Sequence, residues 1–232
     1  MEQIITQDND FNFLKIDYKK IPEIIKDKFV IVLDFDGVVT YHSKINMEYL
    51  REFGYNLNEE ESGHSCVKNG GVKEEHYRIA RFKAQTASPD KLPLSKGFSE
   101  NFSELLKLNN KVIFILTSRY DHMLKHLESY MKHHKIKVDG IINTSELGKT
   151  KFLTDLNANI FVDDNLKKIT EVFSEIKLDN FLKKCDFIFF RTTENKLEMN
   201  PDKKITEIDN WKDLTLFITK KYKEFEENRL FS

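Results

Sequence analysis

Residues 29–40 read Phe-Val-Ile-Val-Leu-Asp-Phe-Asp-Gly-Val-Val-Thr, an apolar run that ends in two aspartates and a glycine. The run Phe29–Leu33 is rich in β-branched residues and contains no polar one, which predicts a strand buried on both faces of a parallel sheet. Asp34 and Asp36 lie two residues apart, so both carboxylates leave the end of this strand on the same side. Gly37 permits a sharp turn directly after them.

Ligands bind at the carboxyl ends of the strands in an open parallel sheet, which is where these two aspartates are expected. A pair of carboxylates there suits a hard cation, or a division of roles between a nucleophile and an acid/base group. On the local pattern alone a second interpretation stays open, in which one aspartate caps the following turn and the other is solvated.

Short apolar runs alternate with amphipathic stretches along the rest of the chain. Further strands are expected at 112–116, 160–162 and 187–190, and at 138–142. The segments between them show helical spacing of apolar residues, at Phe98, Phe102, Leu105 and Leu106, at Leu124, Leu127 and Met131, and at Phe152, Leu153 and Leu156. Strands that alternate with helices predict an α/β protein, a Rossmann-like three-layer sandwich around a central parallel sheet.

The composition limits the classes of protein to which the chain can belong. The 232 residues carry 37 Lys and Arg against 38 Asp and Glu, so the formal net charge is -1. A protein that binds nucleic acid or a membrane surface through charge has a basic excess, so we expect neither partner. The apolar runs are far shorter than a bilayer crossing, and no signal peptide is visible. We therefore expect a cytoplasmic protein, with Cys66 and Cys185 as reduced thiols.

Glycine and proline are unevenly distributed. The chain has 8 Gly and 4 Pro, and eight of these twelve residues lie in or beside the segment 41–94, which is otherwise polar and helical in pattern. The chain is also longer than one average domain. We predict a core domain in residues 29–40 and 95–232, with a small helical subdomain inserted at 41–94. Residues 1–28 form an N-terminal extension, for which an extra helix packed on the core is one interpretation.

The stretch Asp34-Phe-Asp-Gly-Val-Val-Thr40 resembles the first motif of the haloacid dehalogenase-like (HAD) superfamily, which reads D-x-D-G-[TV]-[LV]. The resemblance implies that Asp34 is a nucleophile that takes up a phosphoryl group. It also implies that Asp36 is the general acid/base and that its backbone carbonyl contributes to a Mg²⁺ site. The segment 41–94 then corresponds to the C1 cap, which this superfamily inserts after the first strand and which covers the site and selects the substrate.

Further motifs of the superfamily follow in the order that it requires. The strand at 112–116 with the hydroxyls of Thr117 and Ser118 resembles the second motif, which holds phosphate oxygens. Lys149 resembles the third motif, a lysine that neutralises the phosphate, and Lys151 competes for this assignment. We favour Lys149 because its spacing from the apolar pair that follows turns it to a different helix face from Lys151.

The last motif is matched by the apolar strand expected at 160–162, which is followed by Asp163 and Asp164. The resemblance implies that these residues bind Mg²⁺, and its alignment favours Asp164 as the direct ligand, with Asp163 acting through water or as a supporting group. Adjacent carboxylates repel each other, and a cation relieves that repulsion. The acid at position 36 argues against a haloacid dehalogenase proper, which lacks one there.

Together the motifs imply a Mg²⁺-dependent phosphatase that hydrolyses a small phosphorylated metabolite through an aspartyl-phosphate. Residues 208–211 faintly resemble the tail of HAD-type 5′-nucleotidases, so a nucleotide is one guess at the substrate. A phosphotransferase or mutase, a polynucleotide-end phosphatase, and a non-catalytic protein that binds a phosphorylated ligand are the alternatives. Arg78, Arg81 and Lys83 could meet a substrate anion or form a solvated basic face. The sequence leaves the oligomeric state open.

Overall fold

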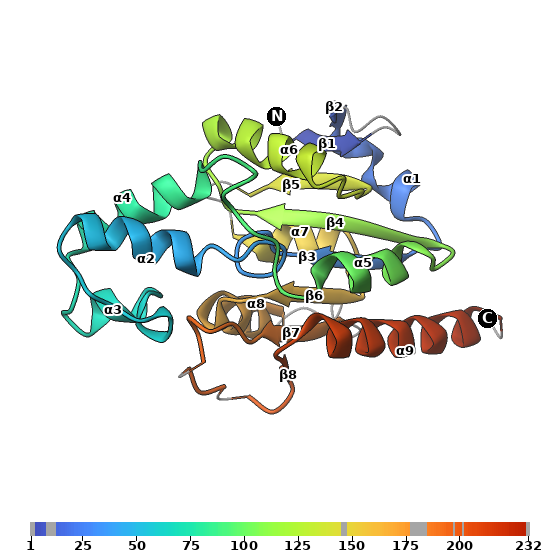
Figure 1. The fold of residues 1–232 in the computed structure, drawn as a ribbon. Coiled ribbons are helices and arrows are strands. Elements are labelled where there is room, and N and C mark those ends of the chain that lie inside the picture. Colours follow the sequence, from blue (N-terminus) through green and yellow to red (C-terminus); the bar gives the residue numbers. More distant parts are fainter. Residues whose placement is uncertain are drawn as a thin grey trace.

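A mostly parallel sheet of eight strands runs through the centre of the described molecule (Figure 1). The computed structural model describes residues 3–7, 13–144, 148–176, 185–196, 198–200 and 202–230. The strands are β1 (Gln3–Gln7), β2 (Phe13–Asp17), β3 (Phe29–Leu33), β4 (Lys111–Thr117), β5 (Gly140–Asn143), β6 (Ile160–Asp163), β7 (Asp186–Phe190) and β8 (Thr206–Ile208). They lie in the order β2-β1-β5-β4-β3-β6-β7-β8, and the pairs are parallel except for the two that β1 makes.

Helices cover both faces of this sheet (Figure 1). The helices packed on it are α1 (Ile21–Ile25), α5 (Phe98–Leu106), α6 (Leu124–His133), α7 (Lys149–Asp155), α8 (Leu166–Ile176) and α9 (Trp211–Leu230), with single 3₁₀ turns η1 (Tyr18–Lys20) and η3 (Asp121–Met123). One buried cluster joins α5, α6 and α9 to one face, and a second joins α1, α7 and α8 to the other. These three layers confirm the predicted Rossmann-like α/β sandwich. None of the helices in the described residues combines the length and apolar character that crossing a bilayer requires.

The apolar run of β3 is continuous because both of its faces are covered. Ile31 and Leu33 belong to the cluster with α5, α6 and α9, whereas Val30 and Val32 belong to the cluster with α1, α7 and α8. Successive side chains of a strand point to opposite faces, so a strand between two helical layers needs an apolar residue at every position. The prediction of a strand at 29–33 that is buried on both faces is thus confirmed.

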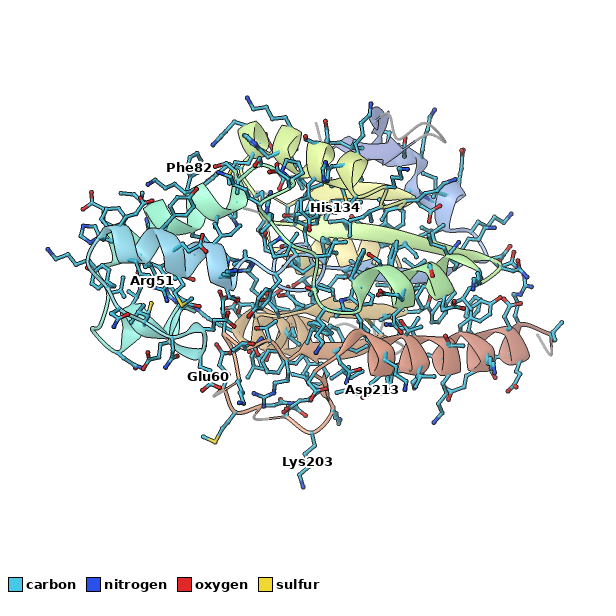
Figure 2. All side chains as sticks on the ribbon, viewed as in Figure 1. Arg51, Glu60, Phe82, His134, Lys203 and Asp213 are labelled. Carbon is cyan, nitrogen blue, oxygen red and sulfur yellow. The ribbon has the colours of Figure 1, made fainter. Side chains whose placement is uncertain are left out.

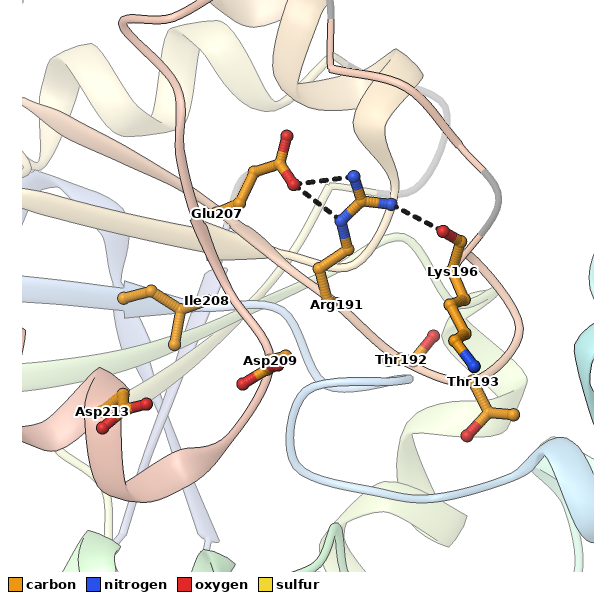
Figure 3. A pocket seen from close by; sticks show the side chains of 8 residues that line it. All are labelled: Arg191, Thr192, Thr193, Lys196, Glu207, Ile208, Asp209 and Asp213. Carbon is orange, nitrogen blue, oxygen red and sulfur yellow. Dashed lines mark hydrogen bonds and ion pairs between the residues drawn. The ribbon is translucent and has the colours of Figure 1, made fainter.

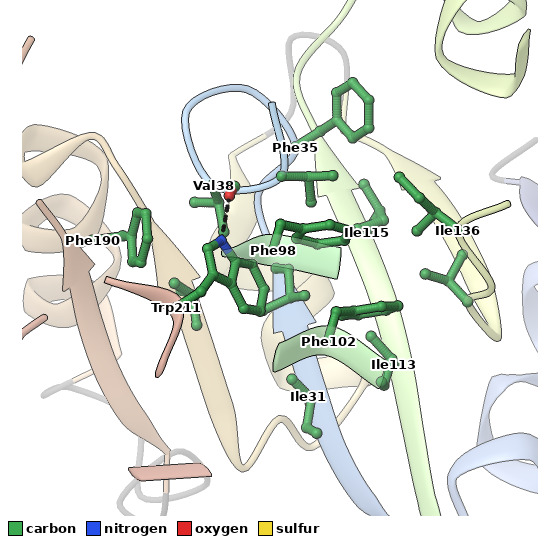
Figure 4. Packing of buried hydrophobic residues seen from close by; sticks show 14 of the residues in the cluster. Ile31, Phe35, Val38, Phe98, Phe102, Ile113, Ile115, Ile136, Phe190 and Trp211 are labelled. Atoms are coloured by element: carbon green, nitrogen blue, oxygen red, sulfur yellow. Dashed lines mark hydrogen bonds between the residues drawn. The ribbon is translucent and has the colours of Figure 1, made fainter. Parts of the chain in front are cut away.

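Trp211, the first residue of α9, ties that helix to the loop that carries the two aspartates. Its indole Nε1 donates a hydrogen bond to the Val38 carbonyl at 2.9 Å, and the ring is fully buried (Figure 4). Phe98 of α5 meets it edge to face at a centroid distance of 4.8 Å. A buried indole N–H needs a partner, and here the partner is the backbone four residues after Asp34. The position of this loop is therefore fixed from the core side.

The described part of residues 1–28 contains a short helix packed on the core, α1, which was one interpretation of the sequence, and also two strands that were not predicted. In the described part of residues 1–28, β1 and β2 form an antiparallel hairpin, and β1 pairs with β5 to extend the sheet. A short α1, with Pro22 in its first turn, then leads into β3. β3 is consequently the third strand of the chain, not the first. The segments at 3–7 and 13–17 are short and mix apolar with polar residues, so their pattern was too weak to predict this pairing.

The segment 41–94 projects beyond the carboxyl ends of the central strands (Figure 1). It contains α2 (Ser43–Glu52), η2 (Glu59–Glu61), α3 (Ser65–Lys68) and α4 (Glu74–Gln85). A small separate cluster of buried residues lies within it: Leu50, Cys66, Val72, Tyr77 and Ala80. The two connections to the rest of the chain are hydrogen bonded to each other, from the Tyr41 amide to the Pro93 carbonyl and from the Ser95 amide to the Val39 carbonyl, each at 2.9 Å. The division of the chain into a core and an inserted domain stays a prediction.

Candidate active site

The carboxyl ends of three neighbouring strands bring the predicted site residues together. β3 lies between β4 and β6, so the residues that end these strands, Thr117 and Asp163, flank the residue that follows β3. The amide of Asp34 donates to the Val162 carbonyl at 2.8 Å, which continues the ladder one residue beyond β3. Asp34 therefore lies beside Asp163 because of the parallel register.

Lys149, the first residue of α7, lies between two of these carboxylates. Its Nζ is 2.5 Å from Asp34 Oδ1 and 2.8 Å from Asp163 Oδ2, and the side chain is buried. Burial works against the charge of Lys149, but the two carboxylates outweigh this effect and raise its pKa. Lys151 lies on the exposed side of α7, with its Nζ 5.7 Å from the centre of the Tyr18 ring. Lys149 is thus the lysine that the fold places against the aspartates.

Asp34, Asp163 and Asp164 form a cluster in which one oxygen of each lies within 4.8 Å of the others. Burial raises the pKa of Asp34, and the charge of Asp163 adds to this while that of Lys149 opposes it. Burial, together with the charges of Asp163 and Asp34, raises the pKa of Asp164 well above its ordinary value. Carboxylates held this close destabilise one another unless a cation joins them, and Mg²⁺ prefers oxygen ligands. The three residues therefore fit a hard divalent cation.

Two neighbours fix the place of Asp164. Gly37 has a φ of +87°, and a Cβ atom on it would lie 1.9 Å from Asp164 Oδ2, so a side chain there would displace that carboxylate. Asn195 Nδ2 donates to the Asp164 carbonyl at 2.7 Å and to the Phe190 carbonyl at 3.0 Å. The sequence analysis did not identify Asn195, because a single asparagine in a loop after a strand carries no distinguishing pattern.

Asp36 has different partners from Asp34. Arg119 Nη2 donates to Asp36 Oδ1 at 2.6 Å and Arg119 Nε to Oδ2 at 3.1 Å, and the side-chain amide of Gln85 donates to Oδ2 at 2.8 Å. Burial acts to raise the pKa of Asp36, but the Arg119 guanidinium outweighs it and holds that pKa well below its usual range. Neither partner was predicted from the sequence. Arg119 directly follows Thr117 and Ser118 of the second motif, and this position is the one sequence feature that could have identified it as a site residue.

Thr117 ends β4, next to Asp34's strand, and Ser118 follows it. Thr117 is buried, as are the five residues before it, and Ser118 is exposed. The Arg119 amide donates a long hydrogen bond of 3.4 Å to Thr117 Oγ1, and Ser118 Oγ lies 3.1 Å from Thr144 Oγ1. The parallel pairing of β4 with β3 brings the end of β4, at Thr117, to the same edge of the sheet as Asp34. The role of Thr117 and Ser118 in holding phosphate stays a prediction.

The segment 41–94 places one positively charged side chain, that of Arg81, near the aspartates. The side chain of Arg81 on α4 is 24% exposed, and its positive charge acts on the carboxylates of both Asp36 and Asp164. Among the described residues its ion-pair partner is Glu194, with Arg81 Nη1 3.9 Å from Glu194 Oε2. Arg78, one turn earlier, is 77% exposed and pairs with a glutamate of the same helix. The structure thus separates one inward arginine from an outward one.

His42 and Glu194 lie next to each other beside Arg81, and neither was predicted from the sequence as a site residue. His42 Nε2 lies 3.4 Å from Glu194 Oε2, and both side chains are buried. Burial lowers the pKa of His42 to about 4, with help from the charge of Arg81 and against the attraction of Glu194. His42 is therefore neutral at pH 7, and the negative charge of Glu194 is left to attract Arg81.

A polar hollow of about 670 Å³ lies beside the ends of β7 and β8 (Figure 3). Its arginine, Arg191, is already bonded: Nε and Nη2 lie 2.8 and 2.6 Å from Glu207 Oε2, and Nη1 donates to the Lys196 carbonyl at 3.1 Å. A guanidinium satisfied in this way is a poor anchor for an incoming anion. The aspartate cluster, not this hollow, is the candidate active site.

The chain resembles known proteins in its fold and not detectably in its sequence. No family model matches the sequence. No curated protein is detectably similar to it. Similar solved structures include a conserved haloacid dehalogenase-like protein of unknown function from Agrobacterium tumefaciens, with a TM-score of 0.55 and 14% identity over 83% of this chain and 98% of that one. A structure described as a dehalogenase has a TM-score of 0.52 and 13% identity over 83% and 97% of the two chains.

A haloacid dehalogenase-like family hydrolase from Xanthomonas campestris has a TM-score of 0.50 and 7% identity, over 87% of this chain and 99% of that one. Identities this low show the fold alone. The chain therefore has the haloacid dehalogenase-like fold that the four motifs predicted, and its activity is a separate question.

Proposed function

We propose that the chain is a Mg²⁺-dependent phosphatase that hydrolyses small phosphomonoesters through an aspartyl-phosphate on Asp34. The observation that supports this most is the difference between the surroundings of Asp34 and Asp36. Asp34 contacts Lys149 within a cluster of acids, whereas Asp36 is held by Arg119 and Gln85. Two carboxylates in such different environments suit a nucleophile and an acid/base group.

In the first step Asp34 attacks the phosphorus and forms a covalent intermediate, which divides one difficult reaction into two easier ones. Lys149 holds the attacking carboxylate in place through its contact with Oδ1. The charge of Lys149 and the hydroxyl of Thr117 then balance the charge that develops on the phosphoryl oxygens. Phosphate-monoester hydrolysis is among the slowest uncatalysed reactions, with enzymatic enhancements up to about 10²¹, so a covalent route is reasonable.

Asp36 moves the protons. Arg119 keeps Asp36 ionised in the substrate-free protein, so Asp36 first takes up the proton of a bound phosphate monoanion and gives it to the leaving oxygen as the P–O bond breaks. It later takes a proton from the water that attacks the aspartyl-phosphate. That attack releases inorganic phosphate and returns Asp34 as a free carboxylate. The two carboxylates thus alternate between bond formation and proton transfer at one phosphorus atom.

Asp34, Asp163 and Asp164 would hold Mg²⁺ together with the Asp36 carbonyl. When bound, the cation screens the charge of the phosphate from that of the attacking carboxylate. Of the two adjacent acids, Asp163 already contacts Lys149, whereas burial and the charges of Asp163 and Asp34 raise the pKa of Asp164 well above its ordinary value. We therefore propose Asp164 as a direct ligand and Asp163 as the residue that orients Lys149.

A screen for inorganic phosphate release tests this function. The panel contains nucleotides, sugar phosphates and p-nitrophenyl phosphate, each with Mg²⁺ and with a chelator. Release with Mg²⁺ that stops on chelation supports the proposal. A lack of release from the whole panel with Mg²⁺ present contradicts it, and consumption of an ester without net phosphate release indicates a phosphotransferase.

Replacing Asp164 by Asn should uncouple the stability of the protein from Mg²⁺. The change removes one of three clustered negative charges, so the unfolding temperature without metal should rise or stay level. Added Mg²⁺ should raise the unfolding temperature of the wild type but shift that of the variant by much less, because binding to the folded state stabilises it by mass action. Thermal unfolding with and without Mg²⁺ measures both effects. An equal metal-dependent shift in the two proteins would exclude Asp164 as a ligand.

We propose that residues 41–94 act as a cap over the core formed by residues 29–40 and 95–232, and that Arg81 contacts the substrate from it. Arg81→Met should lower kcat/KM for phosphate esters by about tenfold, the loss expected for one charge-assisted hydrogen bond. Arg78→Met is the matched control, because that side chain is exposed on the same helix. Steady-state kinetics on both variants decide the point, and equal effects at the two positions would contradict the role of Arg81.

A further inference from the structure

The loop that follows β7 reaches the segment 41–94 through the side chain of Glu194. Glu194 Oε2 lies 3.9 Å from Arg81 Nη1 of α4, and Ser62 Oγ donates to Glu194 Oε1 at 3.4 Å. The two backbones are also close, because a Cβ atom on Gly63 would lie 2.9 Å from the Glu194 carbonyl oxygen. The Glu194 side chain is only 9% exposed. This carboxylate is therefore enclosed between the core and the segment 41–94.

Hydrogen bonds fix the position of this loop on the core. Arg191 Nη1 donates to the Asn195 carbonyl at 3.2 Å, and the Thr192 amide donates to Asn195 Oδ1 at 2.8 Å. The side-chain amide of Asn195 in turn donates to the Asp164 carbonyl at 2.7 Å. Glu194 thus extends from a loop whose next residue is bonded to the acidic cluster.

The guanidinium of Arg81 is largely enclosed but keeps its donors available. It is 24% exposed, and within the described residues it has the ion pair with Glu194 and no hydrogen bond. A guanidinium carries five N–H donors, and donors left without an acceptor in an enclosed site are costly. The negative charges of Asp36, Glu194 and Asp164 all act on this guanidinium. Its free donors suit an anion that enters between α4 and the aspartates.

Glu194 and the aspartates attract the same guanidinium. Without the charge of Glu194, the remaining attraction would come from Asp36 and Asp164, and an arginine paired with them would occupy oxygens that the cation and the proton transfer need. We propose that Glu194 is a positioning residue that holds the Arg81 guanidinium away from the aspartates and in place for a phosphate oxygen of the substrate. This inference rests on the proposed phosphatase function.

Two effects of Glu194 on phosphate binding have opposite signs. A negative charge near the site repels a phosphate, so removal of the charge alone would strengthen phosphate binding. A carboxylate that keeps Arg81 in place aids binding, so its loss would weaken it. Glu194→Gln removes the charge but keeps the size of the side chain and an acceptor for Ser62. The direction of the change in affinity therefore distinguishes a positioning residue from a nearby charge.

The test is the affinity of the full chain for inorganic phosphate with Mg²⁺ present, measured by isothermal titration calorimetry. The wild type, Glu194→Gln, Arg81→Met and the double variant form a double-mutant cycle. Glu60→Gln is the matched control, because Glu60 pairs with Lys196 of the same loop at an exposed edge of the segment 41–94 (Figure 2). Thermal unfolding of each variant verifies that it folds.

We expect Glu194→Gln to weaken phosphate binding about fivefold and Arg81→Met to weaken it about tenfold. In the Arg81→Met background, Glu194→Gln should change the affinity by less than about twofold, because no guanidinium remains to be held. Glu60→Gln should leave the affinity unchanged. Equal or tighter binding in Glu194→Gln, or the same loss with and without Arg81, would overturn the positioning role.

Turnover of phosphate esters, measured on the same preparations, separates this inference from the proposed function. If the wild type hydrolyses esters but the cycle shows no coupling between Glu194 and Arg81, the phosphatase stands and the positioning role is overturned. If the wild type binds phosphate and shows the coupling but hydrolyses no ester, the phosphatase is contradicted and the positioning of Arg81 for an anion stands. A wild type that binds no phosphate with Mg²⁺ present overturns the inference.

Discussion

Replacement of Asp34 by Asn is expected to reduce phosphate release by at least about 10⁴-fold, because loss of a covalent nucleophile removes the route itself rather than one contact. The amide has nearly the shape of the carboxylate but cannot attack phosphorus. Because Asp34 lies within 4.8 Å of two other carboxylates at their nearest oxygens, removing its charge also relieves repulsion. The unfolding temperature should therefore stay level or rise while turnover disappears.

Asp90→Asn is the control for this experiment, since Asp90 is an exposed carboxylate outside the cluster. It should leave turnover unchanged. Phosphate release and thermal unfolding, measured on the same preparations, separate a chemical loss from a folding loss. Substantial residual turnover in a well-folded Asp34→Asn protein would show that another group attacks the phosphorus.

Lys149→Met is expected to affect both stability and activity. The change leaves Asp34 and Asp163 buried without their shared cation, and breaking a buried ion pair on one side costs about 3–5 kcal/mol of unfolding free energy. Turnover should fall by at least about 10²-fold, because the charge that balances the phosphoryl oxygens is lost as well. Chemical denaturation and steady-state kinetics measure the two losses.

The stability loss in this variant should shrink in mildly acidic buffer. Burial already raises the pKa of Asp34, and removal of Lys149 takes away the charge that opposes this shift. A carboxyl whose folded-state pKa lies above its unfolded value destabilises the folded state as the pH rises through that pKa, and protonation restores stability as the pH falls. Lys151→Met is the matched control on the exposed side of α7. A loss of equal size in Lys151→Met would contradict the assignment of Lys149.

The site was predictable from sequence to the extent that it depends on strand ends. Asp34, Thr117 and Asp163 each end an apolar run or follow it directly, and parallel strands of one sheet bring such ends to the same edge. The order of the motifs then predicted the fold, which the similar structures confirm. Residues without a periodic or motif signal, such as Asn195, His42 and Glu194, could not be found in this way.

Local sequence could separate Lys149 from Lys151 but could not show which of the two contacts the aspartates. Both are near the start of α7, and helix spacing shows only that they lie on different faces. Which face meets the aspartates depends on how α7 packs on the sheet, and the structure shows Lys149 within 2.8 Å of both Asp34 and Asp163. The N-terminal hairpin is a similar case, because the pairing of β1 with β5 joins segments more than a hundred residues apart.

The sequence by itself determined that β3 lies inside an α/β sandwich and that two carboxylates leave its end together. Side-chain periodicity, which is a local property of the chain, carries that information. Only the tertiary structure decided what each carboxylate meets. Asp36 is bonded to residues 49 and 83 positions away, and such partners depend on packing between distant segments. The two aspartates look equivalent in the sequence, and their different partners are what suit them to different chemical roles.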